Sequence, residues 1–279
     1  MRTVKLDSDS YTLPSRWQEL TTNDIVTLAK LYLQSNNYVK LKVVFCLYLM
    51  GLRLKYANPV EIDGDKCYYI KHSNKRVYLL GLEQIHQIVS GVEWIFYNED
   101  TPEGRRISIN PRLTANPFRR LKVRFSTLVG PDDALGDISF LEFAFAETYL
   151  YRYAKSQNKY WLDMFIATLW RPVKNGNRVE FDQQKIEQWA KRTARIKPAV
   201  ALAMQWYYAG CKYFLSRKYP KVFTPTGSGG GGDPFEGYMD LTGTLAKSDP
   251  TKFADVHNAN LYFTLISLEQ MLEAAKPKQ

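Results

Sequence analysis

The spacing of apolar residues predicts two helices near the start of the chain. Residues 21–24 (TTND) place an acid three positions after a threonine, which is typical of a helix N-terminus. Apolar residues then recur at intervals of three and four, as on one face of an amphipathic helix: Ile25, Leu28, Ala29, Tyr32 and Leu33. A second helix is predicted from near Asn37 to about Leu54. Asn58 precedes Pro59, and the residue before a proline disfavours helical backbone.

A β-hairpin is predicted after these helices, because the apolar pattern changes its period. Residues 67–70 (CYYI) and 76–80 (RVYLL) are short β-prone runs on either side of a polar connection at residues 72–75 (HSNK). The apolar run at residues 43–52 is shorter than the roughly 20 residues that a membrane span needs. We therefore expect that run to be buried inside the protein.

The rest of the first half is less regular. Residues 1–10 are polar and are expected to be loose. Residues 82–89 predict a short helix, and residues 92–97 fit a strand or a helix equally well. Residues 99–136 are expected to be rich in loops, because four prolines punctuate them.

From residue 137 onward the pattern is helical. Residues 139–142 (SFLE) match a capping box, and Pro198 suits a first helical position. The predicted helices cover residues 139–155, 159–170, 182–193, 198–219, 234–247 and 258–275. Residues 227–232 (GSGGGG) predict a flexible loop between two of them.

These patterns predict a mainly α fold with a helical bundle-like C-terminal half and a minor β-hairpin element in the N-terminal half. We expect two domains. Residues 1–136 would form an N-terminal helical region with the hairpin and a basic loop. Residues 137–279 would form a helical region that contains the Gly-rich flexible loop at 227–232.

Composition excludes a disordered chain and a disulfide-stapled one. The chain has 279 residues, of which 45% are hydrophobic and 14% aromatic, too many for intrinsic disorder. Its three cysteines, Cys46, Cys67 and Cys211, are scattered and form no CxxC pair, which fits a reducing compartment. The first residues contain no apolar stretch of signal-peptide length. We expect a cytoplasmic protein.

No familiar catalytic or metal-binding motif occurs in the sequence. None of His72, His86 and His257 belongs to an HExxH motif or adjoins a CxxC pair, and GxSxG is absent. A phosphate-binding loop needs Lys and Ser or Thr after its last glycine, but Asp233 and Pro234 follow the Gly-rich segment. We therefore predict a protein that is not an enzyme and holds no cofactor and no metal.

Charge is the most informative feature of the sequence. Lys and Arg number 38 against 28 acids, a net charge of +10, and part of this excess lies in residues 105–124 without an intervening acid. The cations of this stretch are Arg105, Arg106, Arg112, Arg119, Arg120, Lys122 and Arg124. Phe118 and Phe125 lie among them. We predict that this stretch binds an anionic partner.

Three interpretations of the basic stretch stay open. It could follow a nucleic-acid backbone, bind an acidic protein surface, or pair with acids elsewhere in this fold. A second cluster, Lys191, Arg192, Arg195 and Lys197, lies near a predicted helix end. Cations there also complement the helix dipole, which is a purely structural reason for them.

The helical half resembles tailed-phage morphogenesis proteins, especially the tail-assembly chaperones made just before the tape-measure protein. The similar segments are residues 140–143 (FLEF), 161–172 (WLDMFIATLWRP), 237–241 (GYMDL) and 260–271 (NLYFTLISLEQM). The resemblance covers roughly residues 137–275. It implies a non-enzymatic phage assembly factor, located in the cytoplasm of the host cell, that holds an aggregation-prone helical partner during tail or particle assembly, or a component of the particle itself.

The sequence therefore favours a phage assembly or structural protein that binds a helical or acidic protein partner. A nucleic-acid-binding protein that uses residues 105–124 is the alternative. We expect no association with a membrane, and self-association is possible.

Overall fold

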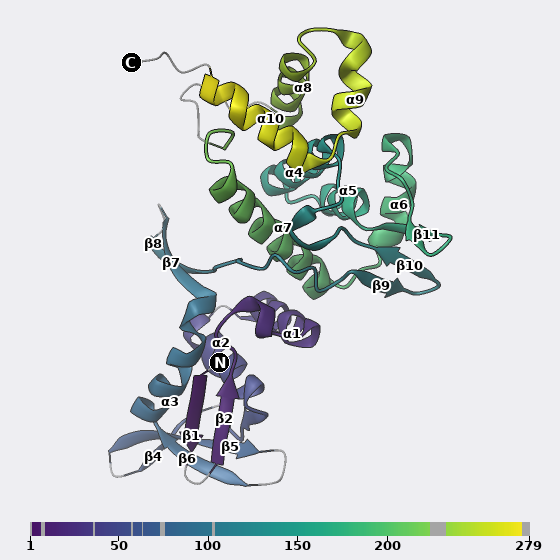
Figure 1. Ribbon diagram of the computed structural model, residues 1–279. Coiled ribbons are helices and arrows are strands. Elements are labelled where there is room, and N and C mark those ends of the chain that lie inside the picture. Colours follow the sequence, from purple (N-terminus) through teal and green to yellow (C-terminus); the bar gives the residue numbers. More distant parts are fainter. Residues whose placement is uncertain are drawn as a thin grey trace. The chain divides into compact units, whose positions relative to one another are not determined.

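A computed structural model shows a chain of helices and small antiparallel sheets (Figure 1). It describes residues 2–6, 9–35, 37–56, 58–62, 64–72, 76–101, 104–223 and 233–274. The chain forms two compact units. Unit 1 comprises residues 1–111 and 198–203, and unit 2 comprises residues 112–197 and 204–279. The predicted division at residue 136 stays a prediction. The Gly-rich loop at 227–232 lies outside the described residues.

Unit 1 begins with a strand pair and two helices. Its helices are α1 (Thr22–Gln34), α2 (Tyr38–Leu49) and α3 (Leu82–Val89). Its strands are β1 (Arg2–Leu6), β2 (Asp9–Leu13), β3 (Leu52–Leu54), β4 (Val60–Ile62), β5 (Asp65–His72), β6 (Val77–Gly81), β7 (Phe96–Thr101) and β8 (Gly104–Ile109). The predicted start of α1 is confirmed, because the Thr21 hydroxyl accepts a hydrogen bond from the backbone N–H of Asp24 at 3.2 Å. Asn37 caps α2 through the N–H of Lys40.

The predicted hairpin is confirmed, and it belongs to a larger sheet. Strands β5 and β6 are antiparallel, with Ile70 opposite Tyr78. Strands β3 and β4 pair with the other side of β5. The second helix was predicted to reach Leu54, which is wrong. Gly51 has a φ of +70°, a left-handed conformation that ends the helix and sends the chain into β3.

Two further expectations for the first half are wrong. The described part of residues 1–10 is not loose, because strands β1 and β2 pair antiparallel and Leu6 and Leu13 are buried. Residues 99–136 are not mainly loop, since they carry hairpin β7–β8 and a second hairpin, β9 (Arg120–Val123) with β10 (Ser126–Val129). Pro111, Pro117 and Pro131 lie outside these strands, where they cost no ladder hydrogen bond, and Pro102 lies outside the described residues.

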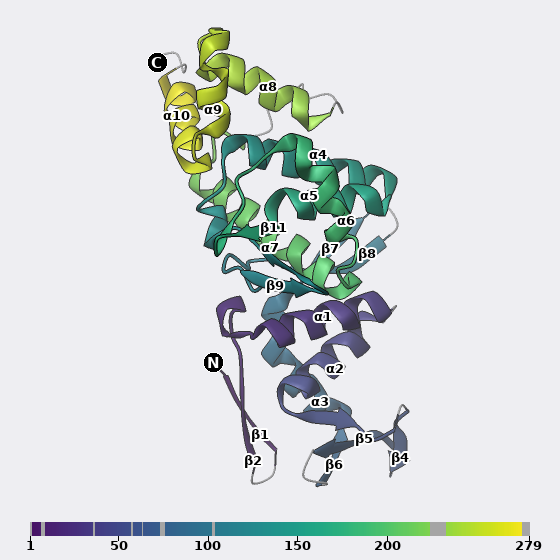
Figure 2. The ribbon, with the colours of Figure 1, turned by 90° about the vertical axis from the view of Figure 1, so that its right-hand side faces the viewer.

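Unit 2 is rich in helices, as predicted for the C-terminal half. Its helices are α4 (Phe140–Ser156), α5 (Lys159–Leu169), α6 (Ile186–Thr193), most of α7 (Pro198–Lys218), α8 (Pro234–Leu245), α9 (Phe253–Asn258) and α10 (Leu261–Ala274). Strand β10 also pairs with β11 (Arg171–Lys174), and β11 pairs with β12 (Asn177–Arg178). The four strands form one antiparallel sheet in the order β12, β11, β10, β9. Figure 2 shows β9 and β11 beside the helices of this unit. The fold is therefore mixed α/β rather than mainly α.

Aromatic side chains form much of the core of unit 2. Phe143, Phe165, Trp170 and Tyr208 are buried, and Trp170 donates its indole N–H to the carbonyl of Phe118 at 3.0 Å. Aromatic rings supply large buried areas, and the indole needs such a partner when it is buried. Among the described helices, none is both long enough and apolar enough to cross a membrane.

Helix α7 packs closely against the backbone of Leu113 at Gly210. A Cβ at Gly210 would overlap the carbonyl oxygen of Leu113 and lie 2.7 Å from its backbone nitrogen, whereas a Cβ at Gly243 in α8 meets nothing within 4 Å. We predict that Gly210→Ala lowers the free energy of unfolding by about 2 kcal/mol through overpacking. Gly243→Ala is the control and should raise it by about 0.5 kcal/mol. Urea unfolding followed by circular dichroism measures both, and equal effects would contradict the packing.

Candidate anion-binding surface

Hairpin β9–β10 presents cations on one face and apolar residues on the other. Arg120 and Lys122 are two residues apart on β9, so they share a face, and both are exposed. Val123 and Leu128 on the other face are buried. The hairpin thus places cations in solvent while its apolar face packs against the core of unit 2.

The turn of this hairpin exposes an aromatic ring. Arg124 and Phe125 form the two-residue connection, and Arg124 has a φ of +49°. This left-handed conformation favours glycine or asparagine and is uncommon for arginine. Phe125 is fully exposed. A fully exposed phenylalanine beside cations is therefore the most unusual surface feature of the hairpin.

The structure does not bring all seven predicted residues together. Arg105 and Arg106 belong to β8 of unit 1, opposite Asp100 and Glu99 in the register with β7, and their side chains lie outside the described part of the chain. The other five, from Arg112 to Arg124, belong to unit 2. The basic stretch is therefore divided between the two units.

Three of these five cations have contacts inside the fold. The Arg112 guanidinium lies 5.3 Å from the ring centre of Tyr213, and Arg119 forms an ion pair with Asp132. Arg120 donates from Nη2 to the carbonyl of Gly176 at 2.7 Å. The intramolecular interpretation thus accounts for part of the stretch. Lys122 and Arg124 are exposed and have no ion pair or hydrogen bond from their side chains to any described residue.

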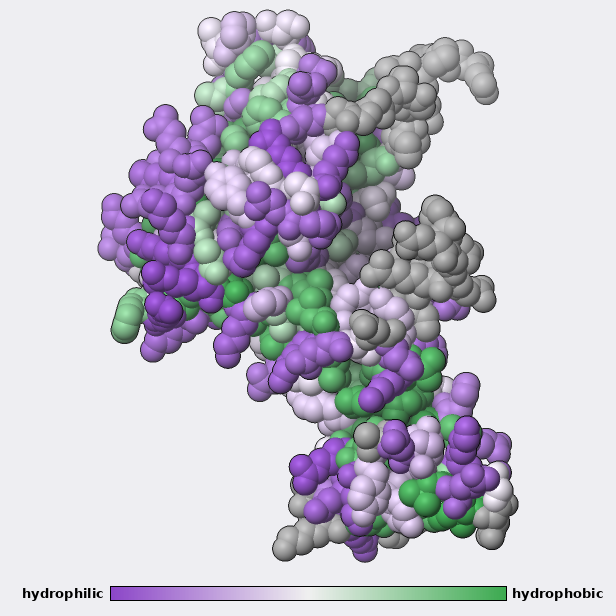
Figure 3. Space-filling view, turned by 180° about the vertical axis from the view of Figure 1, so that it is seen from behind, coloured by the Kyte–Doolittle hydropathy of each residue, from purple (hydrophilic) through white to green (hydrophobic). Residues whose placement is uncertain are grey.

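The two basic clusters meet at this sheet. Arg192, near the C-terminal end of α6, lines a depression of about 350 Å³ together with Arg120 and Phe125. No carboxylate belongs to the described residues that line it. We call Arg120, Lys122, Arg124, Phe125 and Arg192 the cationic surface. In Figure 3 the hydrophilic colour is dense over the part of unit 2 that carries β9–β11 and α6, at the left of the view.

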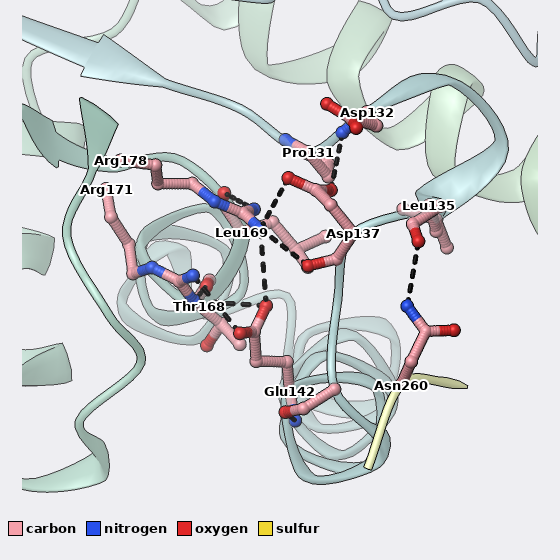
Figure 4. Close-up of polar contacts among 12 residues, drawn as sticks. Pro131, Asp132, Leu135, Asp137, Glu142, Thr168, Leu169, Arg171, Arg178 and Asn260 are labelled. Atoms are coloured by element: carbon pink, nitrogen blue, oxygen red, sulfur yellow. Dashed lines mark hydrogen bonds and ion pairs between the residues drawn. The ribbon is translucent and has the colours of Figure 1, made fainter. Parts of the chain in front are cut away.

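A second, larger cleft next to this surface holds two arginines that sequence reasoning missed. The cleft has a volume of about 740 Å³, and Arg119, Arg120, Arg171 and Arg178 line it. Arg171 and Arg178 come from β11 and β12 and face α4 (Figure 4). No spacing in the sequence marks them, because their partners lie far away along the chain.

Arg171 is almost completely buried, and each of its three guanidinium nitrogens donates a hydrogen bond. Its side chain is 3% exposed, and Nη2 donates to Glu142 Oε1 at 3.1 Å. Nη1 donates to the carbonyl of Thr168 and Nε to that of Val179, both at 2.9 Å. Burial lowers the pKa of Arg171 and the charge of Glu142 opposes that shift. Glu142 was predicted to complete a capping box with Ser139, but its carboxylate binds Arg171 instead, and only the Ser139 half of the box forms.

Arg178 repeats this arrangement at the edge of the cleft. Its Nη2 donates to Asp137 Oδ2 at 3.0 Å, and its Nη1 donates to the carbonyl of Leu169 at 3.1 Å. Glu142 also lies 3.8 Å from Nη2 of Arg178, so the two buried arginines share one carboxylate and Arg178 has a second one in Asp137. The arginines and carboxylates that line the cleft nearly neutralise one another. Their ion pairs join β11 and β12 to the start of α4. Next to this cleft, the cations that are open to an external anion are those of the cationic surface.

Two of the three cysteines are buried, which disfavours their reactive form. Among the residues that the structure describes, no cluster of three His, Cys, Asp or Glu side chains could hold a metal ion. Burial raises the thiol pKa values of Cys46 and Cys211 to about 12. A cysteine nucleophile needs a thiolate near neutral pH, which these two positions disfavour.

Comparisons with known proteins add no relationship. No family model, no curated protein and no solved structure matches the chain.

The contribution of the buried Arg171–Glu142 pair to stability can be tested by substitution. Glu142→Gln leaves the Arg171 guanidinium buried without its carboxylate, so we expect the free energy of unfolding to fall by about 3 kcal/mol. Asp182→Asn is the control, because its partner Lys185 is exposed and an asparagine keeps the cap on the N–H of Gln184. The control should change stability by less than about 1 kcal/mol. Chemical unfolding compares the two, and a loss at Glu142 no larger than the control would disprove a tight buried pair.

Proposed function

We propose that this chain is a non-enzymatic interaction protein whose cationic surface binds an acidic segment of a protein partner. The observation that carries the proposal is Phe125, which is fully exposed beside Lys122 and Arg124, two cations with no carboxylate partner among the described residues. Exposure of an aromatic ring to water is unfavourable, and burial of the ring against a partner would remove that cost. The ring and its neighbouring cations are suited to an interface with an acidic rim and an apolar centre.

The physical roles within such an interface follow from the side chains. Phe125 would insert into an apolar pocket of the partner, where an aromatic ring buries roughly 150–250 Å². Lys122, Arg124 and Arg192 would face carboxylates around that pocket, which steers the encounter and selects against basic partners. Aromatic residues at the centre of an interface typically carry much of its binding energy.

The left-handed backbone of Arg124 fits the same role. Such a conformation costs a non-glycine residue on the order of 1 kcal/mol. Glycine at this position would remove that cost but would also remove the cation. An arginine that keeps its charge at a costly turn position supports a binding role for this turn.

The class of partner rests on the sequence resemblance to tail-assembly chaperones. The residues that carry it include Phe140, Phe143 and Trp170, which belong to the core of unit 2. We propose that the partner is a helical, acidic component of a tailed-phage particle, bound in the cytoplasm of the host cell during assembly.

The test is co-expression with candidate tail and tape-measure proteins followed by pull-down. Lys122→Glu with Arg124→Glu should reduce the retained partner at least tenfold, because both cations would then repel its carboxylates. The control pair is Lys155→Glu with Arg217→Glu, two exposed cations of unit 2 outside the cationic surface, which changes the net charge equally. Equal loss in both double variants would mean that only net charge matters. Retention of no candidate would count against the proposal.

Single-stranded nucleic acid is the second candidate, and Phe125 is the observation that favours it. Bases stack on exposed aromatic side chains while neighbouring cations contact phosphates. The hairpin offers both kinds of contact within a few residues. Such binding would weaken steeply as salt rises, unlike binding through an apolar pocket.

A fluorescent single-stranded oligonucleotide distinguishes the two candidates. If nucleic acid is the ligand, Phe125→Ala should weaken binding by about 1–3 kcal/mol. Replacing Lys122 and Arg124 by Gln should reduce the slope of log K against log [salt] by about 1.4, from two lost phosphate contacts. Fluorescence anisotropy, measured at salt concentrations from about 50 to about 300 mM, gives both the affinity of the Phe125 variant and the salt slope. Undetectable binding at low salt would remove this candidate.

A further inference from the structure

The sheet of unit 1 has an outer face that no described element covers. In an antiparallel sheet, residues directly opposite one another point to the same side. Arg53, Lys71 and Val77 are opposite one another on β3, β5 and β6, and Tyr69 is opposite Leu79. Val60 is opposite Cys67, two positions along β5 from Tyr69. These residues therefore lie on one face of the sheet.

The other face of the same sheet is buried in unit 1. Ile70 is completely buried, and Tyr78 and Leu80 are 5% exposed. On strand β6 the exposed fraction alternates residue by residue, as expected for a sheet with one covered side. The alternation assigns Val77 and Leu79 to the open side.

The open face is apolar where an antiparallel sheet usually presents polar groups. Val60, Val77 and Leu79 are exposed at 39%, 44% and 45%. Large apolar side chains that gather on one exposed face indicate an interaction site more strongly than single ones do. We call Arg53, Lys55, Val60, Tyr69, Lys71, Val77 and Leu79 the outer sheet face.

Charge on this face is mainly positive. Arg53 and Lys71 face outward with Val77, and Lys55 extends β3 by donating its backbone N–H to the carbonyl of Tyr69 at 2.8 Å. The one acid that shares the face among the described residues is Asp65, at the far end of β5. A ligand of this face should therefore carry negative charge beside an apolar stripe.

The aliphatic side chains of the outer sheet face favour a protein ligand over a nucleic acid. Val60, Val77 and Leu79 offer neither hydrogen bonds to phosphate nor a ring on which a base could stack. The aromatic ring of Tyr69 already meets Tyr56 edge-on at 5.8 Å and lies 5.7 Å from the Lys55 ammonium. Aliphatic side chains on β6, beside cations on β3 and β5, match an amphipathic protein segment with carboxylates next to its apolar face.

The dimensions of the face fit a helix. Val77 and Leu79 are about 7 Å apart along β6, and neighbouring strands are about 4.8 Å apart. Apolar side chains at i and i+4 of a helix are about 6 Å apart along its axis, and a helix about 10 Å wide spans two strands. A helical stripe of leucines can therefore contact Leu79, Val77 and Tyr69 together.

We propose that the outer sheet face docks an amphipathic, acidic helix of a protein partner. This proposal rests on the interaction role proposed above, and it adds a second surface that belongs to unit 1 and uses none of the residues of the cationic surface. The two proposals can therefore fail separately.

The test uses two synthetic peptides with the full-length protein. Both have a leucine face, and the flanking residues are glutamates in one peptide and lysines in the other. Fluorescence anisotropy should show the glutamate peptide binding at least tenfold more tightly than the lysine peptide. Leu79→Glu should weaken binding of the glutamate peptide at least tenfold. Val39→Glu, at an exposed apolar position of α2, is the matched control and should have no effect.

Two further variants complete the design. Arg53→Glu with Lys55→Glu should weaken the glutamate peptide even if Leu79→Glu fails to fold, as judged by its thermal unfolding midpoint. Lys155→Glu with Arg217→Glu, two exposed cations outside both surfaces, should leave peptide binding unchanged, which shows that net charge alone is not responsible. Equal affinity for both peptides, or unchanged binding after the Arg53 and Lys55 substitutions, would overturn the proposal. So would tighter binding of a single-stranded oligonucleotide that these substitutions abolish.

Discussion

The guanidinium of Arg171 lies almost entirely out of water, and a charge in that position is stable only if acceptors surround it. Glu142 on α4 supplies the opposite charge, and the carbonyls of Thr168 and Val179 each accept one further hydrogen bond from the guanidinium. This requirement joins β11 to α4. Because β10 pairs with β11 and β9 pairs with β10, the position of the whole sheet in unit 2 depends on that contact.

The same ionic network explains how the positive charge of the chain is distributed. Arg171 and Arg178 are neutralised by Glu142 and Asp137 inside the fold, and Arg119 pairs with Asp132. A net charge of +10 therefore does not describe a uniformly basic surface. In unit 2, two cations without a carboxylate partner among the described residues, Lys122 and Arg124, lie at the tip of one hairpin, next to an exposed ring. Local concentration of charge favours a defined anionic contact over diffuse attraction.

The sheet of unit 1 differs from that of unit 2, because it exposes aliphatic side chains rather than an aromatic ring. Its inner face is buried, and its outer face keeps aliphatic side chains in solvent beside Arg53 and Lys71. The two units thus offer two kinds of surface, one built on an exposed aromatic ring with cations and one on an aliphatic stripe with cations. Both select for acidic partners, which is consistent with the role of an interaction protein.

The sequence by itself determined most helices and their starts. Thr21, Asn37, Ser139 and Pro198 act on backbone groups within about four residues, so their effect is visible in a short window. The hairpin of β5 and β6 was predictable for the same reason, since its strands are adjacent. The exposed cations Lys122 and Arg124, and the ring of Phe125, were also recognised among the candidate residues.

Tertiary structure alone decided the rest. The sheet of unit 2 joins strands from residues 120–129 with strands from residues 171–178, and Glu142 meets Arg171 across 29 positions. Which face of β5 and β6 stays open depends on register, because a shift of one residue exchanges the two faces. Pairings over such distances depend on the packing of the whole unit, and no local pattern encodes them. The sequence therefore identified which residues could bind an anion, and only the folded chain decided which of them are free to do so.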